Sequence, residues 1–90
     1  MIGKEIIVKG MVQGVGWRYY CLKSAEKFYV NGYVKNKRDG SVKIIVEGKK
    51  EEVEKFIEYL KSSNYPGHVK SWEIKEIAYR GIYKDFRIKY

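Results

Sequence analysis

The sequence predicts an α+β domain in which two helices pack on one face of a mixed, largely antiparallel sheet, in the order β-α-β-β-α-β with a short final strand. Apolar residues alternate with polar ones in the segments expected to form strands, and they recur at helical spacing in two other segments. The 90 residues are enough for a single domain over 1–90 with one modest core. A hydrophobic content of 44% supplies that core.

The first strand and the first helix are separated by a change of hydrophobic period. A strand is expected over 4–12, with an apolar face formed by Ile6, Val8 and Val12. Paired glycines in residues 13–16 do not extend a strand. From residue 17 the period is helical, and the expected buried face consists of Trp17, Cys21, Ala25 and Phe28.

A hairpin, a second helix and two strands complete the chain. Strands over 33–37 and 42–47 are joined by a tight turn that contains Asp39-Gly40. A helix over 50–62 follows, with an apolar stripe of Val53, Phe56, Ile57 and Leu60. After a loop at 64–67, a strand over 69–79 is expected to carry a bulge or bend between Ile74 and Ile77. Residues 86–90 predict a short last strand.

This order of elements is the split βαβ, or ferredoxin-like, arrangement. Right-handed crossovers place both helices on one face, and the first two strands are parallel with the third between them. The loop at 13–18 and the end of the second strand near Asn36 then lie at the same end of the sheet. We expect the functional site there, because ligands bind outside the carboxyl ends of parallel strands.

Residues 13–18 have the composition of an anion-binding loop. Gly14 and Gly16 allow successive backbone N–H groups to point inward, and such a nest at a helix N-terminus binds an anion of phosphate size. Arg18, in the first helical turn, opposes the helix dipole, which is explained if its guanidinium binds the same anion. The alternative is a glycine turn followed by a solvated arginine. For Asn36, the alternatives are a turn-capping residue and an amide that positions a water molecule against whatever the loop binds.

Several motifs together resemble the acylphosphatase family over the whole chain. They are residues 10–18 (GMVQGVGWR), Ala25, residues 32–36 (GYVKN), residues 39–42 (DGSV) and the closing residues 86–90 (FRIKY). The resemblance implies an acylphosphatase, an enzyme that hydrolyses carboxylic–phosphoric anhydrides to a carboxylate and inorganic phosphate. It implies that phosphate, which is also an inhibitor, is bound by the Arg18 side chain and by the backbone of Gly14, Val15, Gly16, Trp17 and Arg18. It also implies that Asn36 orients the attacking water, without metal, cofactor or covalent intermediate.

The chemistry of the substrate agrees with a site that has no general acid. The leaving carboxylate has a conjugate acid with a pKa near ~4, so it departs without protonation. Positioning and charge stabilisation then suffice, and an oxygen of the substrate's own phosphate can take the proton of water. Cys21 is therefore expected to be a core residue and His68 a loop residue.

Two positions and one segment depart from the family pattern. Trp17 stands where the family usually has Phe. Tyr29 stands where a glycine usually ends the first helix, so either Tyr29 adopts a positive φ or the helix ends differently, with Asn31 as the cap. Residues 63–71 match poorly.

The charge of the chain leaves other functions open. Nineteen Lys and Arg against eleven Asp and Glu give a net charge of +8, which attracts anions if it is more than compositional bias. The alternative function is a small basic RNA-binding module on a ferredoxin-like fold. Because residues 42–47 contain no aromatic side chain to stack bases, we do not expect a nucleic-acid partner. A carrier or accessory role, as at the head of large carbamoyl-transferring maturation proteins, is a third alternative, which the lack of zinc motifs and further domains disfavours.

Other classes of protein are excluded. One cysteine cannot form an internal disulfide, and Cys21 with His68 alone cannot form a structural zinc site. No apolar run is long enough for a membrane span, and the first residues lack the apolar stretch of a secretory signal. We therefore expect a cytoplasmic monomer that acts on a small acyl phosphate and does not associate with membranes.

Overall fold

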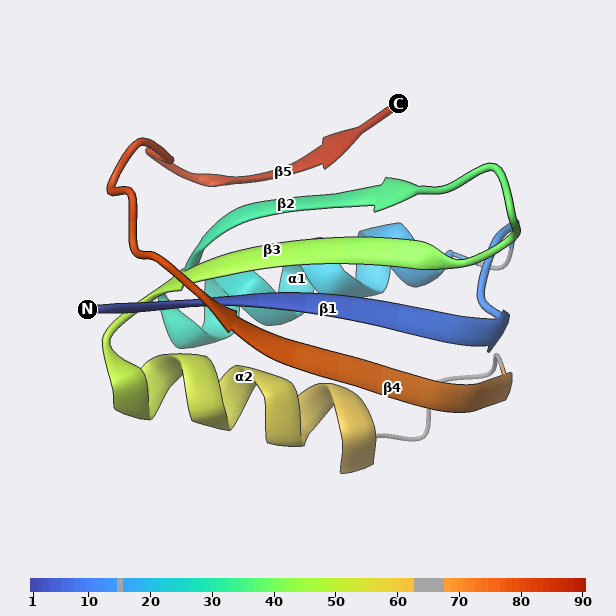
Figure 1. Cartoon of the computed structure of the whole chain (residues 1–90), viewed down its shortest axis with the longest axis horizontal. Coiled ribbons are helices and arrows are strands. Elements are labelled where there is room, and N and C mark those ends of the chain that lie inside the picture. The colour runs from blue at the N-terminus through green and yellow to red at the C-terminus, as the bar shows by residue number, and fades with distance from the viewer. Residues whose placement is uncertain (15, 63–67) are drawn as a thin grey trace.

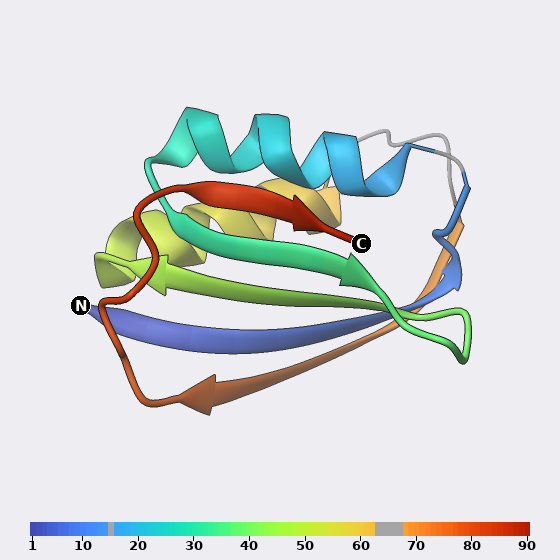
Figure 2. The same ribbon diagram turned by 90° about the horizontal axis from the view of Figure 1, so that it is seen from above.

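The computed structural model describes residues 1–14, 16–62 and 68–90. Its elements are β1 (Ile2–Met11), α1 (Trp17–Phe28), β2 (Asn31–Asn36), β3 (Val42–Gly48), α2 (Lys50–Ser62), β4 (His68–Ile77) and β5 (Phe86–Lys89). The strands form one sheet in the order β4-β1-β3-β2-β5, and both helices cover the same face of it (Figures 1 and 2). The α+β, ferredoxin-like fold class is confirmed. None of the described helices has the length and apolar character needed to cross a membrane.

The pairing of the strands places the two loops of interest at one end of the sheet. β3 is antiparallel to both β1 and β2, so β1 and β2 run parallel with β3 between them. β4 pairs antiparallel with β1, and β5 adds to the other edge parallel to β2. Val42 of β3 pairs with both Val8 and Asn36, so the last residue of β2 is level with Val8, and β1 continues in the same direction to Met11 (Figure 1).

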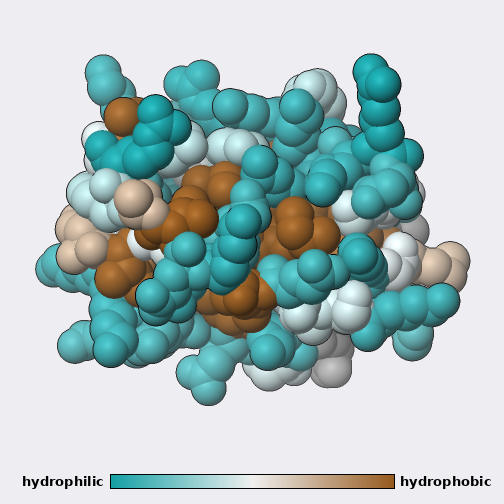
Figure 3. Space-filling model, in the orientation of Figure 1, coloured by the Kyte–Doolittle hydropathy of each residue, from teal (hydrophilic) through white to brown (hydrophobic). Residues whose placement is uncertain are grey.

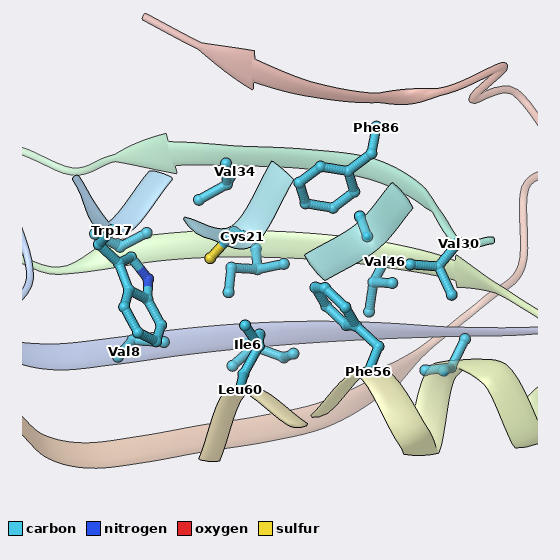
Figure 4. Packing of buried hydrophobic residues seen from close by; sticks show 14 of the residues in the cluster. Ile6, Val8, Trp17, Cys21, Val30, Val34, Val46, Phe56, Leu60 and Phe86 are labelled. Carbon is cyan, nitrogen blue, oxygen red and sulfur yellow. The ribbon is translucent and has the colours of Figure 1, made fainter. Parts of the chain in front are cut away.

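The core lies between the helices and the sheet, and it is built from the faces that the periodicity predicts. Trp17, Cys21 and Ala25 are buried on α1, as are Val53, Phe56 and Leu60 on α2. All six belong to one cluster, and Figure 4 shows Trp17, Cys21, Phe56 and Leu60 packed with Ile6, Val8, Val34 and Val46 of the sheet. Phe56 contacts Phe86 of β5 at a ring-centroid distance of 5.9 Å. Each such large side chain contributes roughly 1.5–3 kcal/mol through burial, so the helical stripes fix the layer order.

Two expectations for the later part of the chain are wrong. The ladder of β4 on β1 is regular from Ile77 to Ser71, and the bulge lies at the other end, where Lys70 is the additional residue opposite the Lys9–Gly10 step. The backbones approach closely there, since a Cβ on Gly10 would clash with the carbonyl oxygen of His68. His68 is the first residue of β4 and not a loop residue. The loop expected at 64–67 falls outside the described residues.

Helix α1 ends at Tyr29 in a left-handed conformation. Tyr29 has φ 58° and ψ 42°, and the N–H of Val30 donates to the carbonyl oxygen of Ala25 at 3.4 Å. Of the two endings that the sequence left open, the chain therefore uses a positive φ at a tyrosine. This conformation costs about 1–2 kcal/mol for a residue with a Cβ.

Candidate active site

Among the described residues, no side chain compensates the positive dipole at the N-terminus of α1. Gly16 is the N-cap residue, with φ 84° and ψ 12°, and no side chain within residues 1–14, 16–62 and 68–90 forms a capping hydrogen bond. The N–H of Tyr20 donates to the carbonyl oxygen of Gly16 at 3.0 Å, and the N–H groups at the start of an α-helix have in general no acceptor within the helix. By contrast, α2 carries Glu51 and Glu52 in its first turn, whereas α1 carries no acidic residue there. These N–H groups are therefore suited to an anion from outside the chain.

Arg18 adds a full positive charge to the same helix end. Its side chain is partly buried, and the guanidinium carbon lies 4.8 Å from the centroid of the Tyr90 ring. In the part of the chain that the structure describes, Arg18 takes part in no salt bridge. A cation at a helix N-terminus without a carboxylate partner is unfavourable unless an anion binds there.

A surface pocket of about 240 Å³ brings these groups together. It is lined by Val12, Gly14, Gly16, Trp17, Arg18, Tyr19, Ile88 and Tyr90. Four of the five residues predicted to bind phosphate share its wall, and the fifth, Val15, lies outside the described residues. Both glycines have a positive φ, 75° at Gly14 and 84° at Gly16, which other residues adopt only at a cost. Gly14 and Gly16 therefore have the left-handed conformation that occurs in nests of N–H groups.

Asn36 ends β2, and its side-chain oxygen needs a donor. Oδ1 of Asn36 is buried and accepts no hydrogen bond from the residues that the structure describes. A buried acceptor in this state is satisfied by a water molecule or a ligand. The structure places Asn36 in the wall of a second pocket, with Lys35, Lys37 and Lys43, and not in the pocket of Arg18. The two predicted catalytic residues thus lie at one end of the sheet but line separate pockets.

Gln13 connects the two regions, although no sequence pattern assigns it a role of its own. Its Nε2 donates to the carbonyl oxygen of Lys37 at 2.7 Å and to that of Ser41 at 2.8 Å. The loop that follows β1 is thereby joined to the turn that follows Asn36. A glutamine beside paired glycines gives no periodic signal, so only the three-dimensional structure reveals this contact.

The turn over 37–41 is held by its own hydrogen bonds. Oδ1 of Asp39 accepts from the hydroxyl of Ser41 at 2.6 Å and from its backbone N–H at 2.9 Å. These two hydrogen bonds, the hydroxyl first, lower the pKa of Asp39 below its ordinary value. The N–H of Lys37 donates to the carbonyl oxygen of Ser41 at 2.8 Å, and that of Gly40 donates to Lys37 at 3.2 Å.

The side chains that most often act in acid–base or nucleophilic chemistry lie elsewhere. Cys21 is completely buried, as predicted, and burial raises the pKa of its thiol, which disfavours the reactive thiolate. His68 is exposed at the start of β4. Among the described residues, no three His, Cys, Asp or Glu side chains are grouped so that they could bind a metal ion.

The open face of the sheet carries charges that are partly paired. Lys43 and Lys75 flank Glu5 at 3.6 and 3.4 Å, and Lys9 lies 3.0 Å from Glu73. Figure 3 shows apolar side chains between these hydrophilic ones on the same face. The residues of β3 on this face include no aromatic side chain, so the stacking platform of an RNA-binding sheet is missing from its middle strand.

The fold is therefore that of a small ferredoxin-like α+β protein with a positively charged pocket at a helix N-terminus. Comparison with known proteins gives its family. A model of the acylphosphatase family matches residues 4–88. An acylphosphatase of Mannheimia succiniciproducens is 40% identical over 83 residues, which cover 92% of this chain and 90% of the relative. An acylphosphatase of Paenarthrobacter aurescens is 37% identical over 81 residues, or 90% of this chain and 86% of the relative. The chain belongs to the acylphosphatase family.

Solved structures agree with this assignment. The acylphosphatase of Bacillus subtilis is 36% identical and superposes with a TM-score of 0.92 over 100% of both chains. HypF of T. kodakarensis is 37% identical with a TM-score of 0.87, and the match covers 100% of this chain but 12% of HypF. Family and fold together support an enzyme that hydrolyses acyl phosphates, and they do not favour the RNA-binding alternative.

Proposed function

We propose that the enzyme binds the phosphate group of an acyl phosphate with Arg18 and the backbone N–H groups of residues 14–18, and that Asn36 orients the attacking water. The observation that carries this proposal is the position of Arg18, which lies at an uncapped helix N-terminus without a carboxylate partner in the described residues. The buried, unsatisfied Oδ1 of Asn36 supports the water-orienting role, because it can accept a hydrogen bond from water.

The reaction is a displacement at phosphorus. The water oxygen forms a bond to phosphorus while the bond between phosphorus and the acyl oxygen breaks, and its electron pair leaves with the carboxylate. One proton of the water passes to a non-bridging phosphate oxygen, and the other stays on the oxygen that was transferred. The guanidinium and the N–H groups stabilise charge on the phosphoryl oxygens, which is the main requirement of phosphoryl transfer.

We also propose how the enzyme is inhibited, that it needs no metal, that it acts as a monomer and in which compartment it works. Inorganic phosphate is the product and a competitive inhibitor, because it fits the same anion site. No metal takes part, since Arg18 and the helix N-terminus supply the positive charge. A monomer suffices, because every group that the proposal names comes from one chain. A single buried cysteine agrees with the reducing cytoplasm as the compartment.

The test is release of phosphate from benzoyl phosphate by the purified protein in the presence of EDTA. We expect saturable hydrolysis that inorganic phosphate inhibits competitively and that added Mg²⁺ does not increase. A protein that hydrolyses nothing under these conditions, yet binds labelled single-stranded RNA with submicromolar affinity at about 0.15 M salt, would contradict the proposal in favour of the RNA-binding alternative.

A further inference from the structure

We propose that Gln13 is a positioning residue that sets the distance between the phosphate-binding loop and Asn36. The inference rests on the proposed function, since it assigns phosphate to the loop and water to Asn36. Gln13 directly precedes Gly14, and one of its two acceptors, the carbonyl of Lys37, directly follows Asn36. The contact between Gln13 and Lys37 is therefore one residue away from Gly14 of the phosphate-binding loop and one residue away from Asn36, which orients the water.

The side-chain amide of Gln13 donates both of its hydrogens. An amide nitrogen carries two hydrogens, and the structure gives it two acceptors, the carbonyl oxygens of Lys37 at 2.7 Å and Ser41 at 2.8 Å. Each of these oxygens also accepts a backbone N–H, from Gly40 and from Lys37 respectively. Gln13 thus occupies the second acceptor position of each carbonyl, so the bond pattern fixes the location of its side chain.

The turn does not need Gln13 for its own shape. Its two backbone hydrogen bonds and the contact of Asp39 with Ser41 already close it. What Gln13 adds is a connection from this turn to the loop after β1. β1 and β2 are not neighbours in the sheet, because β3 lies between them, so strand pairing alone does not join their ends.

The separation of these ends matters for the chemistry. In a displacement at phosphorus, water approaches from the side opposite the leaving group, and the reacting atoms must come within roughly 3–3.5 Å of each other. The loop fixes the phosphorus and Asn36 fixes the water, so an error in their separation affects the reaction and not the binding of phosphate. The kinetic signature of Gln13 is therefore a loss of kcat with phosphate affinity retained.

Two variants and a matched control test this inference with benzoyl phosphate. Gln13→Met keeps the length of the side chain but removes both donors. Gln13→Glu places a carboxylate, which cannot donate, opposite two carbonyl oxygens that it repels. We expect kcat to fall about ten- to a hundredfold, more for Gln13→Glu than for Gln13→Met. The inhibition constant of inorganic phosphate should change less than about threefold. Ser24→Ala, which removes a 2.7 Å hydrogen bond to Tyr20 away from the site, should leave both constants unchanged.

A second measurement needs no variant and no activity. Gln13 is the only glutamine in the chain, so its side-chain amide signal can be identified directly by NMR. We expect its two protons to exchange with solvent at least about tenfold more slowly than those of a free glutamine side chain. Exchange at the free rate would overturn the inference. Wild-type kcat in Gln13→Met, or an equal loss of kcat and phosphate affinity, would also overturn it and leave the proposed function standing. Wild-type protein that does not hydrolyse benzoyl phosphate would instead refute the proposed function.

Discussion

The guanidinium group of Arg18 lies over the ring of Tyr90, with its carbon 4.8 Å from the ring centroid. This contact joins the start of α1 to the residue that follows β5, and both residues line the pocket proposed to bind phosphate. A stacked ring occupies one face of a guanidinium and leaves its N–H edge free to bind an anion. Tyr90 can therefore orient Arg18 without neutralising it.

Replacing Arg18 should remove function without unfolding the protein. Arg18→Gln is expected to lower kcat/KM at least about a hundredfold and to weaken inhibition by inorganic phosphate. Stability should change by less than about 1 kcal/mol, because the loss of a cation–π contact of about 0.5–1 kcal/mol offsets the removal of an unfavourable dipole interaction of similar size. Lys23→Gln, on the exposed side of the same helix, is the control for loss of a cation. Wild-type turnover in Arg18→Gln would show that the site is elsewhere.

Removing the ring of Tyr90 should weaken phosphate binding less than replacing Arg18 does. Tyr90→Ala should weaken binding of inorganic phosphate about two- to fivefold, which corresponds to an exposed cation–π contact. Tyr90→Phe retains the ring face and should bind phosphate as the wild type does. The measurement is the competitive inhibition constant of phosphate for each variant. A stronger effect of Tyr90→Phe than of Tyr90→Ala would mean that the hydroxyl, and not the ring, contacts the ligand.

The sequence contains most of the fold because hydrophobic period depends on local chain geometry. The alternation of Val42, Ile44 and Val46 and the helical stripe over 50–62 both predict buried faces that the structure confirms. The bulge was misplaced because Ile74 and Ile77 lie on opposite faces of a regular strand, Ile74 opposite buried Ile6 and Ile77 opposite Gly3. On this edge strand even Ile74, on the core side, is 38% exposed, so the apolar pattern is not confined to one face.

The assembly of the site is harder to predict than its parts. Gly14, Gly16 and Arg18 are close together in the sequence, and all three line one pocket. The contacts of Gln13 with the turn and of Arg18 with Tyr90 join segments far apart in the chain. Such contacts depend on how strands are ordered in the sheet, and no local pattern encodes them.

Asn36 should affect chemistry more than binding. Asn36→Ala is expected to lower kcat by about a hundredfold, with KM and the inhibition constant of phosphate nearly unchanged. Because Oδ1 of Asn36 is buried and has no donor in the part of the chain that the structure describes, its removal should leave stability level or higher. Asn31→Ala, at the opposite end of the same strand, is the control and should keep wild-type kcat. Loss of phosphate inhibition in Asn36→Ala would place this residue in the phosphate site instead.

Tyr29 offers a stabilising substitution. Tyr29→Gly relieves about 1–2 kcal/mol of left-handed strain but adds chain entropy to the unfolded state, roughly 0.5–1 kcal/mol. The tyrosine side chain is 84% exposed, so little packing is lost. The net gain should be about 0.5–1 kcal/mol, or a Tm higher by roughly 2–8 °C. Tyr29→Ala keeps the positive φ and should give no such gain, so equal Tm increases in both variants would exclude relief of strain as the cause.

The turn over 37–41 follows Asn36 and accepts the hydrogen bonds of Gln13. It should lose stability in acid, because Asp39 becomes protonated. Hydrogen bonds from Ser41 to the ionised carboxylate lower the pKa of Asp39 below its ordinary value of 3.8. A group whose pKa is lowered by folding contributes stability at pH values above the unfolded pKa, and this contribution is lost as the pH falls through the folded pKa. The difference in unfolding free energy between the wild type and Asp39→Ala should therefore be constant above about pH 5 and shrink below about pH 4. Urea unfolding of both proteins at pH 7 and pH 3 measures it. A difference that grows at pH 3 would mean that the neutral carboxyl, and not the carboxylate, holds the turn.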